Sequence, residues 1–373
     1  MRYLLALNTG SSSVKFRLFG FTSALPLAAW GKVTDIGNAP VLSAAREGGP
    51  DHKENLSAAA TQEDAVKTVL QWLAAQAIQP DDVAAIAHRI VHGGARYAKS
   101  VLLDKEACEY LSGLCPLAPL HQPHNLTGVA LLAAEMPGVP QYGCFDTAFH
   151  AGHDALRTTV ALPENIRAQG VRRYGFHGLS YAGIARCLRT DYPHLSAARV
   201  VVAHLGNGAS LCAMKEGKSV DTTMSMTALD GLPMGTRCGA IDAGVIFYMI
   251  RHLGLPPGEV ERILYEESGL KGLSGLTNDV KALSDSDDER AAFALDYFCF
   301  KTAQHVAAMA VSLGGMDALV FTGGIGENAP GIRTRILEQL SFLPPFETHV
   351  IATDEEREMA RDIWNRHERN PAR

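Results

Sequence analysis

The sequence lacks the cysteine patterns that are typical of secreted and zinc-binding proteins. Its cysteines are odd in number, and no two of them form a C-x-x-C pair. They are Cys108, Cys115, Cys144, Cys187, Cys212, Cys238 and Cys299. This scatter argues against a disulfide framework or a zinc site and favours a reducing compartment. The apolar run of the N-terminus, MRYLLALN, is too short for a signal peptide, so we expect a cytoplasmic protein.

Long apolar runs and basic clusters are also missing. The most apolar stretch, 307–321, contains Asp317 and two glycines, so we do not expect it to span a membrane. The net charge is −6 and no basic run occurs, which argues against nucleic acid or an anionic membrane as a partner. With 373 residues, 47% hydrophobic and 20% charged, the chain has the composition of a globular protein with room for two domains.

Apolar runs that suit strands alternate with stretches of helical spacing, and this alternation predicts an α/β fold. The expected strands are 4–7, 14–19, 84–94 with a glycine turn at its end, 141–149, 199–205, 210–214, 218–222 and 317–321. The expected helices are 63–77, 126–136, 287–313 and 330–341. The polar segment 36–60 is predicted to be a long loop or insertion, and 323–328 is predicted to be a loop after a strand.

Two stretches of the chain share one layout. YLLALNTGSSSVKFRL begins at Tyr3 and RVVVAHLGNGASLCAM begins at Arg199, and each reads as an apolar strand, a small polar turn and a second strand. The repetition suggests a duplicated domain. Two unrelated hairpins would give the same layout, so the layout alone leaves both interpretations open.

Three turns rich in small residues stand at the ends of expected strands: Asn8–Ser13, which Lys15 follows, Gly206–Ser210 and Gly323–Asn328. Backbone N–H groups in such turns can converge on an anion because no bulky side chain blocks the approach. One turn of this kind is weak evidence, but three in one α/β chain favour a phosphate site. The motif of a Walker A loop and the third glycine of G-x-G-x-x-G are both missing, so the site is of another kind.

Single polar residues remain ambiguous when each is considered alone. Arg89 and Arg237 stand beside glycine-rich turns and offer planar forks for carboxylate or phosphoryl oxygens, but surface salt bridges would explain them too. His177 could be a packed structural residue and Asp146 a helix N-cap. TDEERE, 353–358, reads as a capping box at the start of a solvated helix.

Eight motifs taken together resolve the ambiguity. They are LNTGSSSVKF (7–16), HRIVHGG (88–94), APLHQPHNL (118–126), FDTAFH (145–150), YGFHGLSY (174–181), HLGNGASL (204–211), MGTR (234–237) and FTGGIGENA (321–329). In this order they closely resemble the acetate kinases, a family of short-chain acyl kinases, from residue 4 to about residue 365. The resemblance implies direct, reversible, in-line transfer of the ATP γ-phosphoryl group to acetate, giving acetyl phosphate and ADP. A propionate kinase or another short-chain acyl kinase is the alternative.

The resemblance also implies an architecture. We expect α/β domains of the duplicated actin-like ATPase (ribonuclease H-like) kind, with an interdomain nucleotide cleft. The first domain would comprise 1–149 plus 357–373, and the second, with the nucleotide site, 150–356. The family further implies Mg²⁺ as cofactor, for which Mn²⁺ can substitute, ATP and ADP as substrates, and a homodimer.

Four residues would perform the reaction by this resemblance. Arg89 would bind the carboxylate, Arg237 and His177 the transferring phosphoryl group, and Asp146 would orient the arginine and the metal-bound groups. A carboxylate with a pKa of about 4 to 5 is already ionised at pH 7, so no general base is needed. The difficulty is repulsion between two anions, which fixed positive charge relieves.

The remaining implied residues surround the two substrates. The acyl pocket would be formed by Val91, Leu120, Phe176 and Ala228, and the metal would be held by Asn8 and Glu355. The phosphates would contact Ser11, Lys15, His121, His204, Gly206, Asn207, Gly208, Ala209 and Ser210. The adenosine would lie near Asp279, Val280, Lys281, Gly324, Ile325, Gly326, Glu327 and Asn328.

This chain departs from the family pattern at two places near those residues. Ala228 stands where the family usually has proline, so the acyl pocket is expected to admit a longer acid such as propionate. Ala240, in CGAID, replaces the first acid of SGDID. A butyrate-type kinase and a polyphosphate phosphatase on the same scaffold are disfavoured by DTAFH and GFHG. A non-catalytic actin-like module that binds ATP would not need two pocket arginines.

Overall fold

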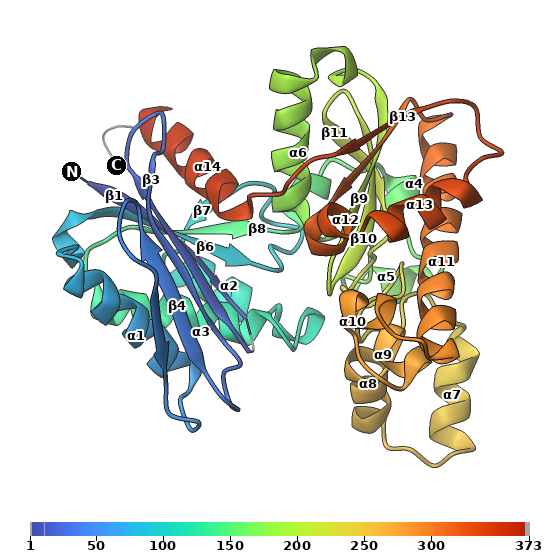
Figure 1. Ribbon diagram of the computed structural model, residues 1–373, viewed down its shortest axis with the longest axis horizontal. Helices are drawn as coiled ribbons and strands as arrows, with labels where there is room; N and C mark the ends of the chain where they lie inside the picture. Colours follow the sequence, from blue (N-terminus) through green and yellow to red (C-terminus); the bar gives the residue numbers. More distant parts are fainter. Residues whose placement is uncertain (1, 11, 370–373) are drawn as a thin grey trace. The chain divides into compact units, whose positions relative to one another are not determined.

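The computed structural model describes residues 2–10 and 12–369 and divides into two compact units (Figure 1). Unit 1 comprises Met1–Phe149 with Asp354–Arg373, and unit 2 comprises His150–Thr353. The functional domains expected from the sequence, 1–149 plus 357–373 and 150–356, stay a prediction.

Unit 1 contains an eight-stranded sheet and its helices. Its strands are β1 (Tyr3–Thr9), β2 (Val14–Gly20), β3 (Leu27–Thr34), β4 (Val41–Arg46), β5 (His52–Asn55), β6 (Val83–Ile90), β7 (Val101–Leu102) and β8 (Gln141–Phe145). Its helices are α1 (Gln62–Ala75), α2 (Lys105–Ser112), α3 (Gln122–Glu135) and α14 (Glu355–Arg369).

Unit 2 contains a five-stranded sheet and more helices. Its strands are β9 (Arg199–Leu205), β10 (Ala209–Lys215), β11 (Lys218–Thr222), β12 (Ala318–Thr322) and β13 (Glu347–Val350). Its helices are α4 (Ala155–Thr158), α5 (Glu164–Arg167), α6 (Gly178–Asp191), α7 (Ala243–Arg251), α8 (Pro257–Glu266), α9 (Gly269–Ser274), α10 (Val280–Ser284), α11 (Glu289–Leu313), α12 (Gly323–Asn328) and α13 (Pro330–Gln339).

The two sheets repeat one topology. The order β3-β2-β1-β6-β8 in unit 1 corresponds to β11-β10-β9-β12-β13 in unit 2. In each sheet the central strand, β1 or β9, pairs antiparallel with the next strand of its hairpin and parallel with a later one, β6 or β12. The two hairpins predicted from the sequence are therefore corresponding parts of a duplicated α/β unit, and the duplication is confirmed.

Helices cover the sheet of unit 1. Alternate residues of β1, such as Leu5 and Leu7, join a core with Phe16 of β2 and with Val69 and Trp72 of α1. Helix α14 packs against β1, β2 and β6, and the Arg357 guanidinium of α14 lies over the Phe19 ring of β2, 5.1 Å from its centroid. Because side chains alternate along a strand, the residues between those of the core belong to the face that α14 covers.

In unit 2, the long helix α11 packs against β9, β10 and β11, while α6 packs against β9. Strand β12 is buried along its whole length, as the apolar run ALVFT predicts. Among the residues that the structure describes, no helix combines the length and the apolar character that crossing a membrane requires. All seven cysteines are free thiols.

Two local predictions were wrong. Segment 36–60 is not a long loop, because β4 and β5 within it extend the sheet beyond β3. The segment is polar because most of β5 is exposed at the edge. The second error is 323–328, which forms the short helix α12 rather than a loop. The Glu327 carboxylate accepts a hydrogen bond from the Gly323 N–H at 2.9 Å and so closes that helical turn.

Glycine at position 31 of β3 is required by close packing. A Cβ atom there would lie 2.6 Å from Cε1 of Phe16 and 2.7 Å from the Ser43 carbonyl oxygen, closer than van der Waals contact permits. We expect Gly31→Ala to reduce the free energy of unfolding by about 1–3 kcal/mol through overpacking. Urea-induced unfolding followed by circular dichroism would measure this loss.

The matched control is Gly258→Ala in α8, where an added Cβ would meet no atom within 4 Å apart from the neighbouring backbone of its own helix. This variant should be at least as stable as the parent, because alanine favours a helix over glycine. Equal unfolding midpoints for the two variants would contradict the packing argument.

Candidate active site

Arg89 of β6 lies in unit 1 between two carboxylates. Its Nε and Nη2 donate to the two oxygens of Asp146 at 3.1 and 2.8 Å, and its Nη1 lies 3.1 Å from Oε2 of Glu355. Strands β6 and β8 are parallel neighbours in which Arg89 pairs with Cys144, two residues before Asp146. Carboxylates therefore contact both sides of the Arg89 guanidinium. The ion pair with Asp146 is not a surface salt bridge, since Asp146 is only 2% exposed.

Burial governs the electrostatics of this cluster. Burial raises the pKa of Asp146 above its ordinary value, and the adjacent Arg89 only partly opposes that shift. Burial alone would lower the pKa of Arg89, but the Asp146 and Glu355 carboxylates outweigh it and raise that pKa, so the guanidinium keeps its charge. A positive charge is therefore fixed in place by its neighbours, which is the condition for binding an anion without reorganisation.

Two further predicted residues share the sheet face of this cluster. Asn8 and Lys15 are direct partners across β1 and β2, so their side chains lie on the same face. Lys15 is exposed. The start of α14, where Glu355 lies, is capped by Asp354, whose Oδ1 accepts from the Arg357 N–H at 3.0 Å. The helix start is therefore capped by Asp354 and not by the Thr353 hydroxyl, which a capping box in TDEERE would use and which donates to Ser180 instead, while Glu355 contacts Arg89.

The other residues predicted for unit 1 take varied positions. Val91 is buried and its backbone N–H donates to Oδ1 of Asn125 at 3.0 Å, whereas Leu120 is half-buried. His121 precedes the first residue of α3. Ser11 lies outside the described residues.

Unit 2 brings His177 and Arg237 to one glycine. A Cβ atom at Gly208 would lie 3.3 Å from Nε2 of His177 and 3.7 Å from Nη1 of Arg237. An imidazole and a guanidinium therefore face the turn between β9 and β10. This is one of the three turns that the sequence associates with phosphate. Gly206 closes this turn by donating its N–H to the Gly208 carbonyl at 3.1 Å.

His177 is held in a strained position before α6. Its φ angle is 57°, in the left-handed region that non-glycine residues rarely adopt. Nε2 of His150 donates a hydrogen bond to the Phe176 carbonyl at 2.9 Å. This bond fixes the peptide group that joins Phe176 to His177. Nδ1 of His177 lies 2.8 Å from Oγ of Ser210, and its ring stacks on that of His204 with centroids 4.3 Å apart.

Arg237 is anchored through the backbone of a neighbouring loop. Its Nη1 donates to the Ala228 carbonyl at 3.0 Å. Ala240, which replaces an acid of the family pattern, donates its N–H to the Gly231 carbonyl at 2.9 Å and keeps the loop closed. The four predicted acyl-pocket residues divide between the units, with buried Phe176 and half-buried Ala228 in unit 2.

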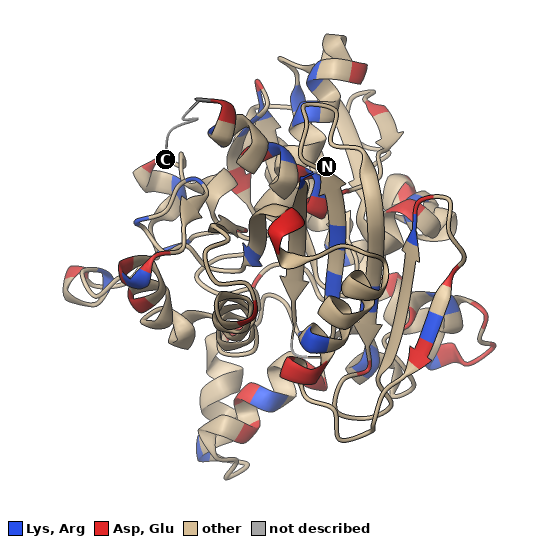
Figure 2. Cartoon of the chain, turned by 90° about the vertical axis from the view of Figure 1, so that its left-hand side faces the viewer, with Lys and Arg blue, Asp and Glu red and all other residues tan. Residues whose placement is uncertain are grey.

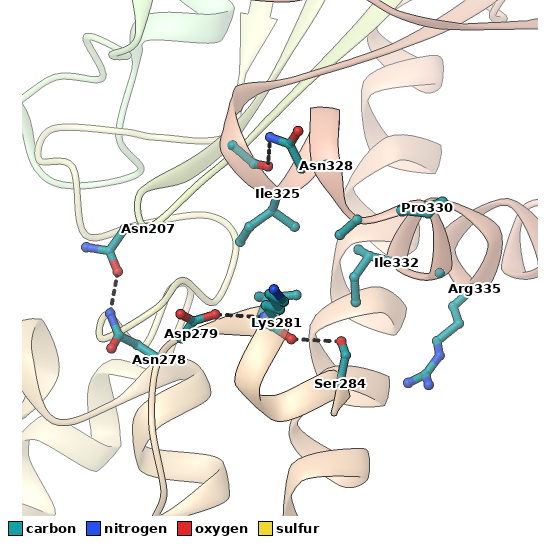
Figure 3. Close-up of a pocket in the computed structure, with 14 residues that line it drawn as sticks. Asn207, Asn278, Asp279, Lys281, Ser284, Ile325, Asn328, Pro330, Ile332 and Arg335 are labelled. Carbon is teal, nitrogen blue, oxygen red and sulfur yellow. Dashed lines mark hydrogen bonds between the residues drawn. The ribbon is translucent and has the colours of Figure 1, made fainter. Parts of the chain in front are cut away.

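A pocket of about 690 Å³ in unit 2 collects most of the predicted adenosine residues (Figure 3). It is lined by Asn207, Asn278, Asp279, Val280, Lys281, Ser284, Gly324, Ile325, Asn328, Ala329, Pro330, Gly331, Ile332 and Arg335. Nδ2 of Asn278 donates to Oδ1 of Asn207 at 2.8 Å and thereby joins the pocket to the turn that faces His177.

Two of the residues predicted to contact adenosine lie outside this pocket, and a third also caps a helix. Gly326 and Glu327 do not line the pocket, and Oε1 of Glu327 accepts from Thr353 as well as Gly323. Asp279 lines the pocket, but its Oδ1 also caps α10 by accepting from the Lys281 N–H at 2.8 Å.

Sequence reasoning missed the residues that the fold brings in from α13, such as Ile332 and Arg335. The only available signal was Pro330, which marks a helix start directly after GGIGENA. It also missed His150, although the motif FDTAFH contains it, because nothing in the sequence shows a contact with a carbonyl 26 residues away.

The model of the acetokinase family matches residues 3–364. The chain belongs to the acetokinase family. An acetate kinase of Nitrobacter hamburgensis is 44% identical over 349 residues, which cover 92% of this chain and 86% of that protein. Members of this family are therefore its relatives along nearly its whole length.

Solved structures of acetokinase relatives have the same fold. A propionate kinase from Francisella tularensis aligns with a TM-score of 0.90 at 33% identity and covers 97% of this chain and 99% of its own. The acetate kinase of Porphyromonas gingivalis aligns with a TM-score of 0.86 at 32% identity, covering 97% and 98%. The mixed α/β fold with two sheets is thus the acetokinase fold, in agreement with the duplicated actin-like architecture expected from the sequence.

Three buried histidines and one half-buried histidine are expected to make the stability of this acetokinase sensitive to acid. Burial lowers the pKa of His88, His92 and His153 to about 4 and that of His150 to about 3. Below the ordinary value of about 6.5 the unfolded chain binds protons that the folded chain does not, so stability falls as the pH falls. Each such histidine lowers the free energy of unfolding by up to about 1.4 kcal/mol for each pH unit below that value.

We therefore expect the urea midpoint of unfolding to decrease steeply between pH 6.5 and 5. His88→Gln should reduce this slope, because it removes one of the four groups. A midpoint that stays constant across this range would show that these histidines are not neutral in the folded protein.

Proposed function

We propose that this chain is an acetate kinase, which transfers the γ-phosphoryl group of ATP to acetate and forms acetyl phosphate and ADP reversibly. Membership of the acetokinase family, with curated acetate kinases 43–44% identical over 92% of the chain, carries this proposal. The geometry supports it, since each unit holds an arginine that a hydrogen bond fixes in place, Arg89 by Asp146 and Arg237 by the Ala228 carbonyl, and such an arginine suits an anionic substrate.

Arg89 is the proposed carboxylate ligand. Asp146 holds its Nε and Nη2 edge, which leaves Nη1 as the group that a substrate oxygen would contact. Glu355 now takes that position at 3.1 Å. No base is assigned, because the acid is ionised at neutral pH.

Arg237 and His177 are the proposed ligands of the transferring phosphoryl group. Both face Gly208, where a phosphate oxygen could approach the backbone closely because no Cβ stands in the way. Donors held in fixed positions stabilise the charge of the transferring group, which is the main demand of this chemistry.

The oxygen donors near Arg89 fit a magnesium ion. Mg²⁺ prefers one or two carboxylates, with water and substrate phosphates completing its shell. Glu355 at the start of α14 and the side-chain oxygen of Asn8, which shares its sheet face with Lys15, would supply the protein ligands. In the described part of the chain no group of three acidic, His or Cys side chains could hold a metal alone, so the phosphates would be needed. By ligating the ion, Glu355 would release Nη1 of Arg89 to the acid.

The adenosine would occupy the 690 Å³ pocket, between Asp279–Lys281 and the Gly324–Asn328 segment. Ile325 and Ile332 offer apolar contacts for the base and Ser284 a hydroxyl. The pocket volume falls within the range of about 300–1,000 Å³ that is usual for small-ligand sites.

A homodimer is also part of the proposal. Helix α7 has no buried residue, although its sequence AGVIFYMIR is strongly apolar. Val245, Phe247, Tyr248 and nearby Leu253 are each between 40% and 55% exposed. An apolar patch of this kind favours a protein partner, and a second copy of the chain fits the family expectation.

We further propose a cytoplasmic enzyme without nucleic acid or membrane partners. The free cysteines and the negative net charge support this. In Figure 2 the basic and acidic segments are scattered over the strands and helices in view.

The proposed function is tested by hydroxamate formation from acetate, ATP and hydroxylamine. The parent protein should form acetyl hydroxamate, whereas a non-catalytic ATP-binding module would form none. Arg237→Gln should reduce kcat by about 10²–10³-fold, because a donor to the transferring group is lost.

The control is Arg262→Gln, which removes an arginine that pairs with Glu267 at the surface of α8. Its activity should stay within about twofold of the parent, since exposed ion pairs contribute little. Full activity in Arg237→Gln would overturn the assignment.

Acid selectivity tests the role of Ala228. Propionate should be turned over with a kcat/KM less than about a thousandfold below that of acetate, since one methylene changes discrimination by about 10–200-fold. Ala228→Pro should increase the preference for acetate, while the carbonyl to which Arg237 donates is retained. Comparison of kcat/KM for acetate, propionate and butyrate in both proteins measures this, and an unchanged ratio would exclude residue 228 from the acyl pocket.

A further inference from the structure

Behind His177 lies a chain of two hydroxyl groups. Oγ of Ser210 lies 2.8 Å from Nδ1 of His177 and 2.5 Å from the hydroxyl oxygen of Tyr181. Ser210 belongs to β10, and Tyr181 belongs to the first turn of α6, which begins directly after His177. Tyr181 and Ser210 are fully buried and His177 is nine-tenths buried, so bulk water does not compete with these contacts.

Counting protons limits how this chain can be arranged. A serine hydroxyl has one proton, so Ser210 donates to only one of its two neighbours. Burial raises the pKa of Tyr181 well above its ordinary value, so the phenol keeps a proton to donate. If Tyr181 donates to Ser210, the proton of Ser210 is directed to Nδ1 of His177.

The direction of this chain decides which nitrogen of His177 carries the proton. When Nδ1 accepts, the proton of the neutral ring is on Nε2. Nε2 is the nitrogen that faces Gly208, next to Nη1 of Arg237. The reverse direction would place a lone pair of Nε2 against an incoming anion. Stacking on His204 at 4.3 Å favours neutral rings, because two imidazolium ions at that distance would repel each other.

A second pair of hydroxyl groups supports the neighbouring ring in the same way. Oγ of Ser180 lies 2.8 Å from Nδ1 of His204, and Oγ1 of Thr353 donates to that serine at 2.9 Å. Nε2 of His204 again points to a glycine of the turn, 3.9 Å from a Cβ built on Gly206. Both stacked imidazoles thus have hydroxyl support at Nδ1 and present Nε2 to the turn.

We propose that Tyr181 and Ser210 are positioning residues that fix His177 as the tautomer with the proton on Nε2, so that this N–H donates to the transferring phosphoryl group. The proposal rests on the proposed function for the identity of the acceptor. The tautomer itself is a property of the protein and can be measured without turnover.

The test is ¹⁵N NMR of imidazole nitrogens in the full-length protein, with the His177 signals assigned by their loss in His177→Asn. In the parent, Nε2 of His177 should carry the proton and Nδ1 should show the shift of an acceptor. Tyr181→Phe keeps the ring in place but removes the proton that directs Ser210, so the two tautomers should become mixed. Ser210→Ala should produce the same mixing by a second route.

Kinetics give an independent readout. Tyr181→Phe should lower kcat about tenfold, less than full loss of a donor, with KM for acetate within about twofold of the parent. The matched control is Tyr97→Phe in unit 1, a partly buried tyrosine whose ring stacks on Phe145. It removes the same atom and should leave both the His177 signals and kcat unchanged.

Two results would overturn the proposal: a proton on Nδ1 of His177 in the parent, or a His177 tautomer that stays unchanged from the parent in both Tyr181→Phe and Ser210→Ala. If the protein forms no acetyl hydroxamate but shows the expected tautomers, the proposed function is refuted. The role of the Tyr181 and Ser210 hydroxyl groups in fixing the tautomer would still stand.

Discussion

The buried ion pair between Arg89 and Asp146 is the interaction on which the proposed substrate site of unit 1 depends. Removing charges from water costs several kcal/mol per ion, and only close, doubly hydrogen-bonded geometry offsets that cost. The parallel register of β6 and β8 supplies this geometry, because it places the two residues at the same ends of adjacent strands. The sheet therefore fixes a guanidinium in a position that a flexible surface arginine would not keep.

Duplication of the sheet gives unit 2 an equivalent framework for a different task. In the turn of its central hairpin, Gly206–Gly208, the residue that His177 and Arg237 face is Gly208, which has no side chain. Each side chain is in turn fixed from behind, the imidazole by Ser210 and the guanidinium by the Ala228 carbonyl. The same hairpin topology thus places backbone groups, a guanidinium and an imidazole at the proposed phosphate site, with the supporting groups on β10 and in the loop that contains Ala228.

The sequence was a good guide where one face of an element is buried and a poor guide at edges and in long-range contacts. The hairpins and α11 were predictable because their apolar residues follow the period of a strand or a helix. Strand β5 was not predictable, because most of it is exposed and it has no apolar alternation. The pairing of Arg89 with Asp146 and the hydroxyl contacts of His177 join residues 29–57 positions apart, and no local pattern encodes them.

The hydrogen bond between Asn278 and Asn207 has a consequence for selectivity. Asn278 belongs to the pocket and Asn207 to the glycine turn, whose backbone also accepts from the Gly235 N–H. A base that displaced Asn278 would pull on the turn that we propose as the phosphate site. Poorly fitting nucleotides would then be rejected by slow chemistry as well as by weak binding, since the fit at one end of the molecule sets the alignment at the other.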